Sequence, residues 1–332
     1  LVKRMVIKSA FVTVQNGTVK GDIQVNVTDA DEVYNSFTLA QNATIDGDYG
    51  IIVAQKAYGA NNFGSTVNVN GKITGTSSAL WVLGNITTDW KNAKNPVVVN
   101  VGSTAVLTNP TAEKTALQMA GSCVVTIEDG AQITGGTAVE VRAGKLVVNG
   151  GTITGTGTPT SSHPNGSGTS TVGAGIAIAQ HTTKLPIDVV VNGGAIKGHT
   201  GFYVTNPQNN TEVNQVTATI NGGDFVTTGT NAVAKDENAT NAGVAVAGGS
   251  FTGNIDNSLL AEGFEAVQGS DGKLTVTVDT KSEATWTENG VKKAGTLDAA
   301  IKALKDQGGT IVVLKDATIT DAEYVLNNKI TL

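Results

Sequence analysis

The sequence has few of the residues that mark several common classes of protein. It contains one cysteine and six prolines in 332 residues, and 15% of its residues are charged, against about 25% in an ordinary globular domain. One cysteine excludes an intrachain disulfide. Only two arginines occur, Arg4 and Arg142, which argues against bidentate recognition of phosphate or carboxylate. The formal net charge of −6 disfavours a nucleic-acid partner, which would need a basic face.

Long apolar runs are also missing. No run approaches the roughly 18–20 apolar residues of a membrane-spanning helix, so we expect no membrane span. The first residues show neither the basic nor the apolar region of a signal peptide, and we expect any targeting peptide to lie outside this sequence. Cys123 lies in the strand-like run Ser-Cys-Val-Val-Thr-Ile. A lone cysteine in such a run is predicted to be a small buried apolar residue.

Glycine, by contrast, is abundant, and it marks a repeated motif. The 41 glycines accompany many Thr, Val and Asn residues, a composition typical of β-structure with many tight corners. Residues 146–155 read Leu-Val-Val-Asn-Gly-Gly-Thr-Ile-Thr-Gly, and related strand–Gly-Gly–strand units occupy 189–198, 217–226 and 244–253. Repetition of this kind indicates a repeat architecture.

The apolar residue that follows each corner defines the period of the repeat. Successive residues of this set are 20 to 43 positions apart, most of them 26 to 29, and the set is Val19, Ile45, Ile73, Val106, Ile133, Ile153, Ile196, Phe225 and Phe251. Apolar and polar residues alternate on both sides of each corner, as half-buried strands do. Such spacing predicts an all-β right-handed parallel β-helix, a solenoid. A β-sandwich, the main competitor, would show strands every 8–12 residues without this recurring corner.

The longest interval contains a polar insertion at residues 155–175, and shorter excursions lie at 87–95 and 205–214. We expect all three to leave the solenoid at its corners.

After residue 280 the pattern changes. Residues 297–308 predict a short amphipathic helix with Thr296 as N-cap and Gly308 as its stop. Strands are predicted at 310–314, 317–319 and 329–332. The expected organisation is therefore a β-helix over 1–280 and a helix-plus-strand segment over 281–332.

Three segments carry a family resemblance: Gly-Gly-Ser-Phe at 248–251, Leu-Leu-Ala-Glu-Gly-Phe-Glu-Ala-Val at 259–267, and Asp-Gly-Lys-Leu-Thr-Val at 271–276. Together with the Asn-Gly-Gly coils, they resemble the closing coil of pectate-lyase-like parallel β-helices in large bacterial cell-surface proteins. Residues 296–332 are similar to the opening of such a β-helix, where a short amphipathic helix caps the first coil. The resemblance implies an extracellular, adhesin-like protein in which 281–332 begins a following module. The alternative is that 281–332 is a C-terminal cap.

No catalytic constellation, cofactor site or metal site is expected from the residues. Asp29, Asp31, Asp46 and Asp48 come nearest to a calcium-ligand set, but they lack the twelve-residue spacing of an EF-hand. Asp46 and Asp48 flank a glycine and suit a solvated corner. The alternation of 139–142 predicts that Glu140 and Arg142 both face solvent as a weak surface pair.

Trp81, Trp90 and Tyr203 are the candidate ligand contacts, because aromatic side chains on a solenoid can meet glycans or proteins. The sequence therefore favours a non-catalytic structural or adhesive surface protein, a module of a larger or filamentous assembly. Its expected partners are neighbouring copies or modules joined end to end, with host glycans or proteins as further partners. The alternative is a β-helix that binds or degrades polysaccharides, either a lyase or a hydrolase.

Overall fold

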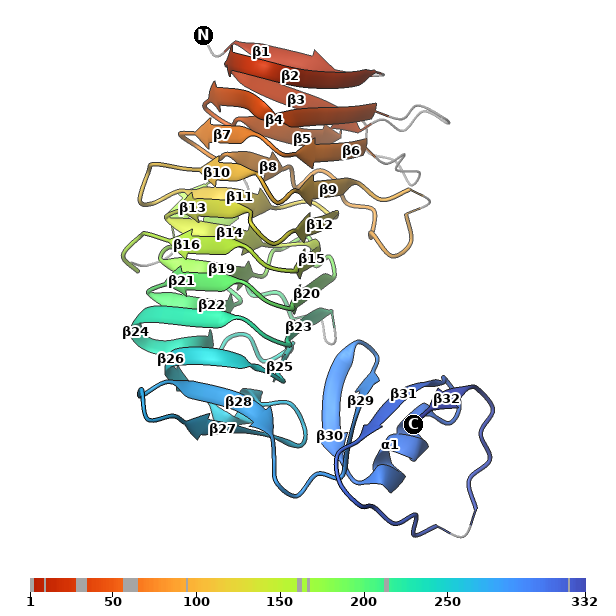
Figure 1. The fold of residues 1–332 in the computed structure, drawn as a ribbon. Helices are drawn as coiled ribbons and strands as arrows, with labels where there is room; N and C mark the ends of the chain where they lie inside the picture. The colour runs from red at the N-terminus through yellow and green to blue at the C-terminus, as the bar shows by residue number, and fades with distance from the viewer. Residues whose placement is uncertain are drawn as a thin grey trace.

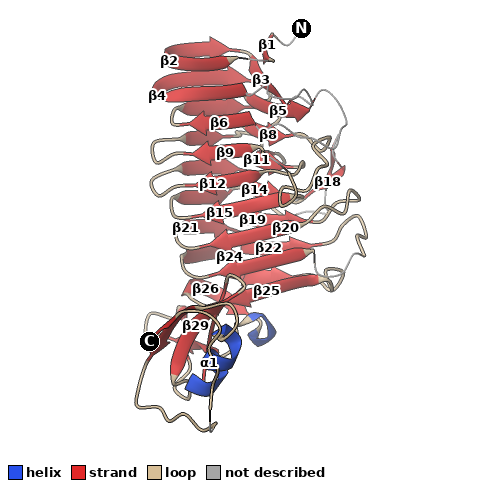
Figure 2. Ribbon diagram, turned by 90° about the vertical axis from the view of Figure 1, so that its right-hand side faces the viewer, coloured by secondary structure: helices blue, strands red, loops and turns tan. Residues whose placement is uncertain are grey.

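The computed structural model describes residues 3–8, 10–27, 35–55, 65–93, 95–159, 163–165, 168–211, 215–321 and 323–332. These residues form a column of stacked β-coils, with the N-terminus at one end and a small unit with an α-helix at the other (Figures 1 and 2). The strands of successive coils pair in parallel. The predicted fold class, an all-β parallel β-helix, is confirmed.

Each coil contributes one strand to each of three parallel sheets, and long strands turn a corner to serve two of them. Sheet 1 contains the first halves of β2 (Phe11–Lys20) and β4 (Asn35–Gly47), then β6 (Ser65–Val69), β9 (Val98–Val101), β12 (Val124–Ile127), β15 (Gly144–Val148), β20 (Ile187–Val191), β23 (Val216–Ile220) and β25 (Ala242–Val246).

Sheet 2 contains the second halves of β2 and β4, then β7 (Lys72–Gly75), β10 (Val106–Thr108), β13 (Gln132–Gly135), β16 (Thr152–Gly155), β21 (Ala195–Gly198), the start of β24 (Asp224–Lys235) and β26 (Gly249–Ile255). Sheet 3 contains β1 (Arg4–Ile7), β3 (Asp22–Val27), β5 (Ile51–Gln55), β8 (Leu80–Val82), β11 (Thr115–Met119), β14 (Thr137–Val141), β19 (Ala174–Ala179), β22 (Thr200–Thr205) and the end of β24.

The core is a column of stacked apolar side chains inside the coils. The ladder on sheet 2 runs through Val19, Ile45, Ile73, Leu107, Ile133, Ile153, Ile196, Phe225 and Phe251, each paired with the next. This is the predicted set with one correction, because Leu107 takes the place assigned to Val106. The corner at 102–105 holds one residue more than the prediction allowed, so Val106 faces outward and Leu107 is fully buried.

The last coil is closed by an antiparallel hairpin. After the 3-10 turn η1 (Asn257–Leu259), strand β27 (Phe264–Gln268) leads into β28 (Leu274–Val278), which pairs antiparallel with both β27 and β26. The hairpin thereby covers the last strand of sheet 2. A further antiparallel pair, β17 (His163–Asn165) and β18 (Gly168–Ser170), belongs to the predicted insertion at 155–175.

The C-terminal unit has a sheet and a core of its own. Its four strands follow the order β30 (Val291–Gly295), β29 (Ala284–Glu288), β31 (Gly309–Val313) and β32 (Ile330–Thr331), and α1 (Leu297–Leu304) packs on them. Seven side chains form its buried core: Ala284, Trp286, Leu297, Ala300, Ile301, Leu304 and Ile311. The unit meets the closing coil through a hydrogen bond from Ala294 N to Glu262 O (3.0 Å) and an ion pair of Lys293 with Glu262 (3.4 Å).

The helix prediction in this unit is confirmed, with an earlier end. The Thr296 hydroxyl accepts from the N–H of Ala299 at 3.2 Å, and Gly308 has the positive φ of a C-terminal glycine, although the helix itself ends at Leu304. Strands match the predictions at 310–314 and 329–332. Residues 317–319 form no strand, so that prediction is wrong. The prediction also omitted the β29–β30 hairpin, which the adjacent Asn289 and Gly290, both at positive φ, could have revealed as a two-residue turn.

Candidate functional site

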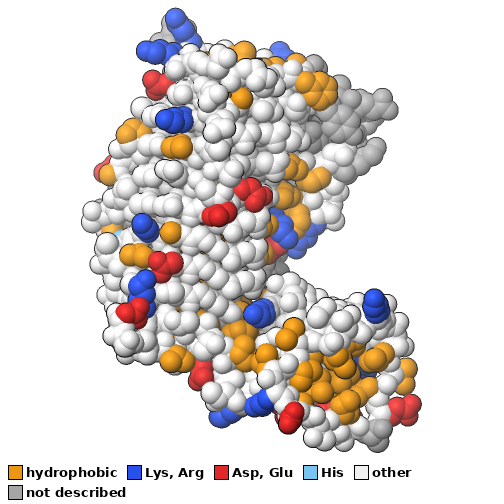
Figure 3. Space-filling view, in the orientation of Figure 1, with side chains coloured by type: hydrophobic (Ala, Val, Ile, Leu, Met, Phe, Trp, Pro, Cys, Tyr) orange, Lys and Arg blue, Asp and Glu red, His pale blue; other side chains and the backbone are white. Residues whose placement is uncertain are grey.

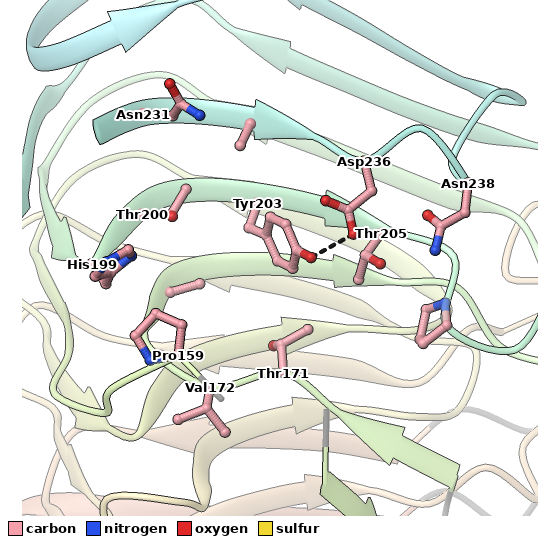
Figure 4. Close-up of a pocket in the computed structure, with 13 residues that line it drawn as sticks. Pro159, Thr171, Val172, His199, Thr200, Tyr203, Thr205, Asn231, Asp236 and Asn238 are labelled. Carbon is pink, nitrogen blue, oxygen red and sulfur yellow. Dashed lines mark hydrogen bonds between the residues drawn. The ribbon is translucent and has the colours of Figure 1, made fainter. Parts of the chain in front are cut away.

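A cavity of about 510 Å³ opens on the outer face of sheet 3, over β19, β22 and the end of β24 (Figure 4). Its described lining is Pro159, Thr171, Val172, Ala174, His199, Thr200, Tyr203, Thr205, Pro207, Asn231, Ala234, Asp236 and Asn238. Its volume lies within the range of about 300–1,000 Å³ that small-molecule sites occupy. The cavity contains one of the predicted contact residues, Tyr203.

The hollow arises from small residues beside a large one. Alternation along β22 places Phe202 and Val204 inside the coil and Tyr203 outside. The neighbours of Tyr203 in the parallel register are Ala177 on β19 and Ala234 on β24. Ala234 lines the cavity, and because alanine extends no further than Cβ it cannot cover the tyrosine ring, whereas Ala177 has no exposed surface.

A carboxylate fixes the tyrosine. The Tyr203 hydroxyl donates to Asp236 Oδ2 at 2.5 Å, and Asp236 is held in turn because its N–H donates to the carbonyl of Val204 and its carbonyl accepts from Ala239 N. Burial and the bond to Asp236 raise the pKa of Tyr203 to about 12. The phenol therefore stays protonated at neutral pH and keeps its role as the donor.

The rim of the cavity is built from amides. Asn238 Oδ1 accepts from the N–H of Asn206 at 2.9 Å, and Asn206 Nδ2 donates to the carbonyl of Asn238 at 3.2 Å. Asn206 and Asn210 form further side-chain–backbone bonds and are nearly inaccessible. Figure 4 places Asn238 beyond Asp236, and His199 on the opposite side of Tyr203. The predicted excursion at 205–214 therefore supplies the buried support of this rim.

Glu140 and Arg142 correct a prediction. They were expected in solvent, yet Glu140 has no exposed surface and Arg142 is 1% exposed. Their ion pair measures 2.8 Å from Arg142 Nε to Glu140 Oε1. Gln118 donates to the same carboxylate at 3.0 Å, Thr171 N donates to it at 2.7 Å, and Arg142 Nη2 donates to Ser170 Oγ at 3.0 Å. Both side chains do point out of the coil, but the returning half of the insertion covers them.

Trp81 shares the outward column of Tyr203 on sheet 3. Residue pairing runs from Trp81 through Gln118, Glu140 and Ala177 to Tyr203. The Trp81 ring is half-buried and stacks on Tyr49, with centroids 4.8 Å apart and planes at 21°. The structure thus places two of the three predicted contact residues on one face, four strands apart.

Trp90 lies elsewhere, on the predicted excursion at 87–95 between β8 and β9. Its backbone N–H donates to Ser122 Oγ at 2.8 Å, which ties the loop to the next coil. The ammonium groups of Lys91 and Lys145 lie 5.3 and 5.5 Å from the ring centroid, a cation–π arrangement. Both ammonium groups therefore lie close enough to attract the ring.

Of the four calcium candidates, the structure describes Asp46 and Asp48. Asp46 is exposed at the end of β4, while Asp48 accepts from Thr76 Oγ1 at 2.8 Å in the turn that follows. Asp29 and Asp31 lie outside the described residues. In the part of the chain that the structure describes, no group of three or more His, Cys, Asp or Glu side chains is arranged to hold a metal ion.

Cys123 is confirmed as a buried core residue. It has no accessible surface, and burial raises the pKa of its thiol, because the thiolate would lose its hydration.

Sequence reasoning found Tyr203 but missed Asp236, His199 and Asn238, which lie 33, 4 and 35 residues away along the chain. No spacing motif joins them, because stacking of coils with loops of unequal length brings them together. Comparison with family models, with curated proteins and with solved structures finds no match. Within the described ranges, no helix is long and apolar enough to span a membrane.

Proposed function

We propose that this chain is a non-catalytic structural module of an extracellular, cell-surface or filamentous assembly, joined end to end to further β-structure. The support comes from where its apolar surface is exposed. Strand edges are unpaired at the N-terminal end of the column, and the exposed large apolar side chains of the described residues lie on the first coil, the closing hairpin and the C-terminal unit.

The distribution of exposed large apolar side chains is the observation that carries this proposal. Eleven such side chains are found in the described chain, and one of them, Val267, lies on the closing hairpin. Met5, Val6 and Phe11 lie on the first coil, and the other seven, on the C-terminal unit, are Val312, Val313, Leu314, Ile319, Val325, Leu326 and Leu332. Figure 3 shows apolar side chains gathered on the visible face of the C-terminal unit. Exposed patches of this kind mark interaction surfaces.

Strand pairing supports the same proposal at the N-terminal end. Among the described strands, β1 pairs only with β3 and β2 only with β4. The first coil therefore presents unpaired N–H and C=O groups beside its apolar side chains, a template for another strand layer. An end-to-end joint of two β-helices would satisfy the hydrogen bonds and bury the apolar groups together.

The joint is tested by sedimentation velocity over a range of concentrations and by negative-stain electron microscopy. We expect concentration-dependent linear oligomers of the natural chain. The double variant Val312→Lys/Val325→Lys should shift the chain to monomers, because charged ends resist burial. A matched control, Thr152→Lys/Thr217→Lys, puts the same charges on the exposed sides and should leave the oligomers unchanged.

Compact monomers at every concentration, together with isolated short particles for the full-length protein, would contradict end-to-end joining. The cell-surface location is tested separately by antibody labelling of intact cells, and labelling that appears only after lysis would contradict it.

A second candidate, saccharide binding, is favoured by the Tyr203 cavity. Hydrolysis of a glycosidic bond ordinarily uses two carboxylates that flank the bond. Asp236 is the one carboxylate among the described residues that line the cavity. Binding is therefore a better match to this lining than cleavage.

A further inference from the structure

We propose that the cavity around Tyr203 is a binding site for a neutral saccharide. The site lies on the outer face of sheet 3, away from both ends of the column, so it does not depend on end-to-end joining. Three features of the cavity carry the inference: an uncovered aromatic ring, hydrogen-bonding groups around that ring, and the balance of charge in the lining.

The ring offers an apolar platform. Tyr203 is half-buried and lines the cavity, and Figure 4 shows its ring lying between His199 and Asp236. Its neighbour Ala234 also lines the cavity and is too short to cover the ring. A pyranose has an apolar face made of C–H groups, which can pack on an aromatic ring without losing hydrogen bonds, since its hydroxyl groups point outward from the rim of the sugar ring.

Polar groups surround the platform at the places where sugar hydroxyls would lie. Asp236 Oδ2 accepts a hydrogen bond from Tyr203. Its Oδ1 accepts none from the described residues, so it can accept a hydrogen bond from a sugar hydroxyl group. The Asn238 oxygen is bound to Asn206, and its amide N–H groups remain donors at the rim. Thr200 and Asn231 add further donors and acceptors. Hydroxyl groups, which both donate and accept, match this mixed set.

Charge narrows the ligand class. The described lining contains no lysine or arginine, and Asp236 is the one carboxylate in it. A uronic acid or a sulfated sugar would bring a second negative charge toward Asp236, and the described lining holds no lysine or arginine to balance it. One oxygen of this carboxylate also already accepts the hydrogen bond from the Tyr203 hydroxyl. The lining therefore favours a ligand that carries hydroxyl groups and no net charge.

The site is held in shape before a ligand arrives. The Tyr203 hydroxyl is anchored by Asp236, and Asp236 is anchored to the backbone of Val204 and Ala239. Asn206 and Asn210, both nearly fully buried, support the rim. Since the ring and the carboxylate do not need to be ordered on binding, less conformational entropy is lost.

The test is isothermal titration calorimetry with neutral trisaccharides of glucose, mannose, galactose and xylose. Trigalacturonate and triglucosamine serve as anionic and cationic comparators. The chain is diluted to a concentration at which sedimentation velocity detects monomers, so that end-to-end joining does not affect the result. We expect at least one neutral trisaccharide to bind with a dissociation constant below about 1 mM and to bind more tightly than both charged comparators.

Two variants assign the binding to this cavity. Tyr203→Ala removes the platform, and Ala234→Leu fills the hollow while leaving Tyr203 in place. Each should weaken binding at least about tenfold. Tyr49→Ala, which removes an aromatic ring that does not line the cavity, is the matched control and should bind as the natural chain does. Circular dichroism and melting temperature establish that each variant is folded.

Three outcomes would overturn the proposal. The first is that none of the four neutral trisaccharides binds below about 10 mM. The second is that triglucosamine or trigalacturonate binds more tightly than every neutral trisaccharide, which would assign the site to a charged ligand. The third is that Tyr203→Ala and Ala234→Leu both bind like the natural chain, which would place the saccharide elsewhere on the molecule. None of these outcomes bears on whether the ends join.

Discussion

At the scale of single residues, strand alternation decides which side chains leave the coil, and the covering loops decide which of them meet solvent. Tyr203 and Glu140 occupy the same outward column on sheet 3. Tyr203 stays accessible, whereas Glu140 and Arg142 are covered by the returning insertion at Ser170 and Thr171. An ion pair expected to contribute little at a surface thereby becomes a buried, fully bonded network, in which removal of one partner is costly.

Removing one member of this pair should destabilise the fold strongly. We expect Glu140→Gln and Arg142→Met each to lower the free energy of unfolding by about 3–5 kcal/mol, because the remaining charge is left buried without its partner. Chemical denaturation monitored by circular dichroism measures the change. The double variant should recover part of the loss. A change below about 1 kcal/mol in both single variants, typical of an exposed pair, would contradict the buried network.

At the scale of the repeating element, the Gly-Gly corner determines how closely one coil lies on the next. The second glycine of each corner, at Gly151, Gly194, Gly223 and Gly249, has φ between +90° and +115°, a conformation that other residues rarely adopt. The preceding Asn residues form a ladder between coils, in which Asn192 donates to Asn149 at 3.2 Å and Asn221 donates to Asn192 at 3.1 Å. The recurring triplet therefore encodes both the turn and its register.

The two glycines of one corner should respond differently to alanine. A Cβ on Gly194 would lie 2.8 Å from Gly151 O at a φ of +99°, so Gly194→Ala should cost about 1–3 kcal/mol of stability. Gly193 has no positive φ, and its nearest atom would be Asn149 O at 3.1 Å. Gly193→Ala is therefore the matched control and should cost less. Equal losses, measured by thermal or chemical denaturation, would contradict the assigned role of the second glycine.

At the scale of the whole molecule, the chain contains two cores of very different size. The β-helix core runs through all the coils from Ile7 to the closing hairpin, whereas the C-terminal unit has seven buried side chains. A unit this small rarely gains more than about 3–5 kcal/mol from its own core. Its exposed apolar patch fits a segment that gains stability when further β-structure covers it.

The C-terminal unit should therefore unfold before the β-helix. Trp286 lies in its core, so the variant Trp81→Phe/Trp90→Phe reports on this unit alone by tryptophan fluorescence. We expect its unfolding midpoint at a lower denaturant concentration than the midpoint of far-ultraviolet circular dichroism. The reciprocal variant Trp286→Phe should follow the β-helix transition. Coincident transitions in all three measurements would show one cooperative unit instead.

Local chemistry along the chain was enough to establish the architecture. Alternation gives the buried side of each strand, and the Gly-Gly corner gives the turn, so the ladder from Val19 to Phe251 was predicted with one exception. That exception, Leu107 in place of Val106, follows a corner with one extra residue. The helix at 297–304 was predicted because its cap and its apolar face are also local.

Tertiary structure alone decided the candidate site and the covering of sheet 3. Asp236 reaches Tyr203 only because β24 stacks beside β22, at a separation of 33 residues along the chain. The burial of Glu140 and Arg142 depends on where the polar insertion at 155–175 returns, and neither its length nor its composition specifies this path. Local patterns fix the direction in which a side chain leaves its strand, whereas its final environment depends on segments that fold over it from elsewhere in the chain.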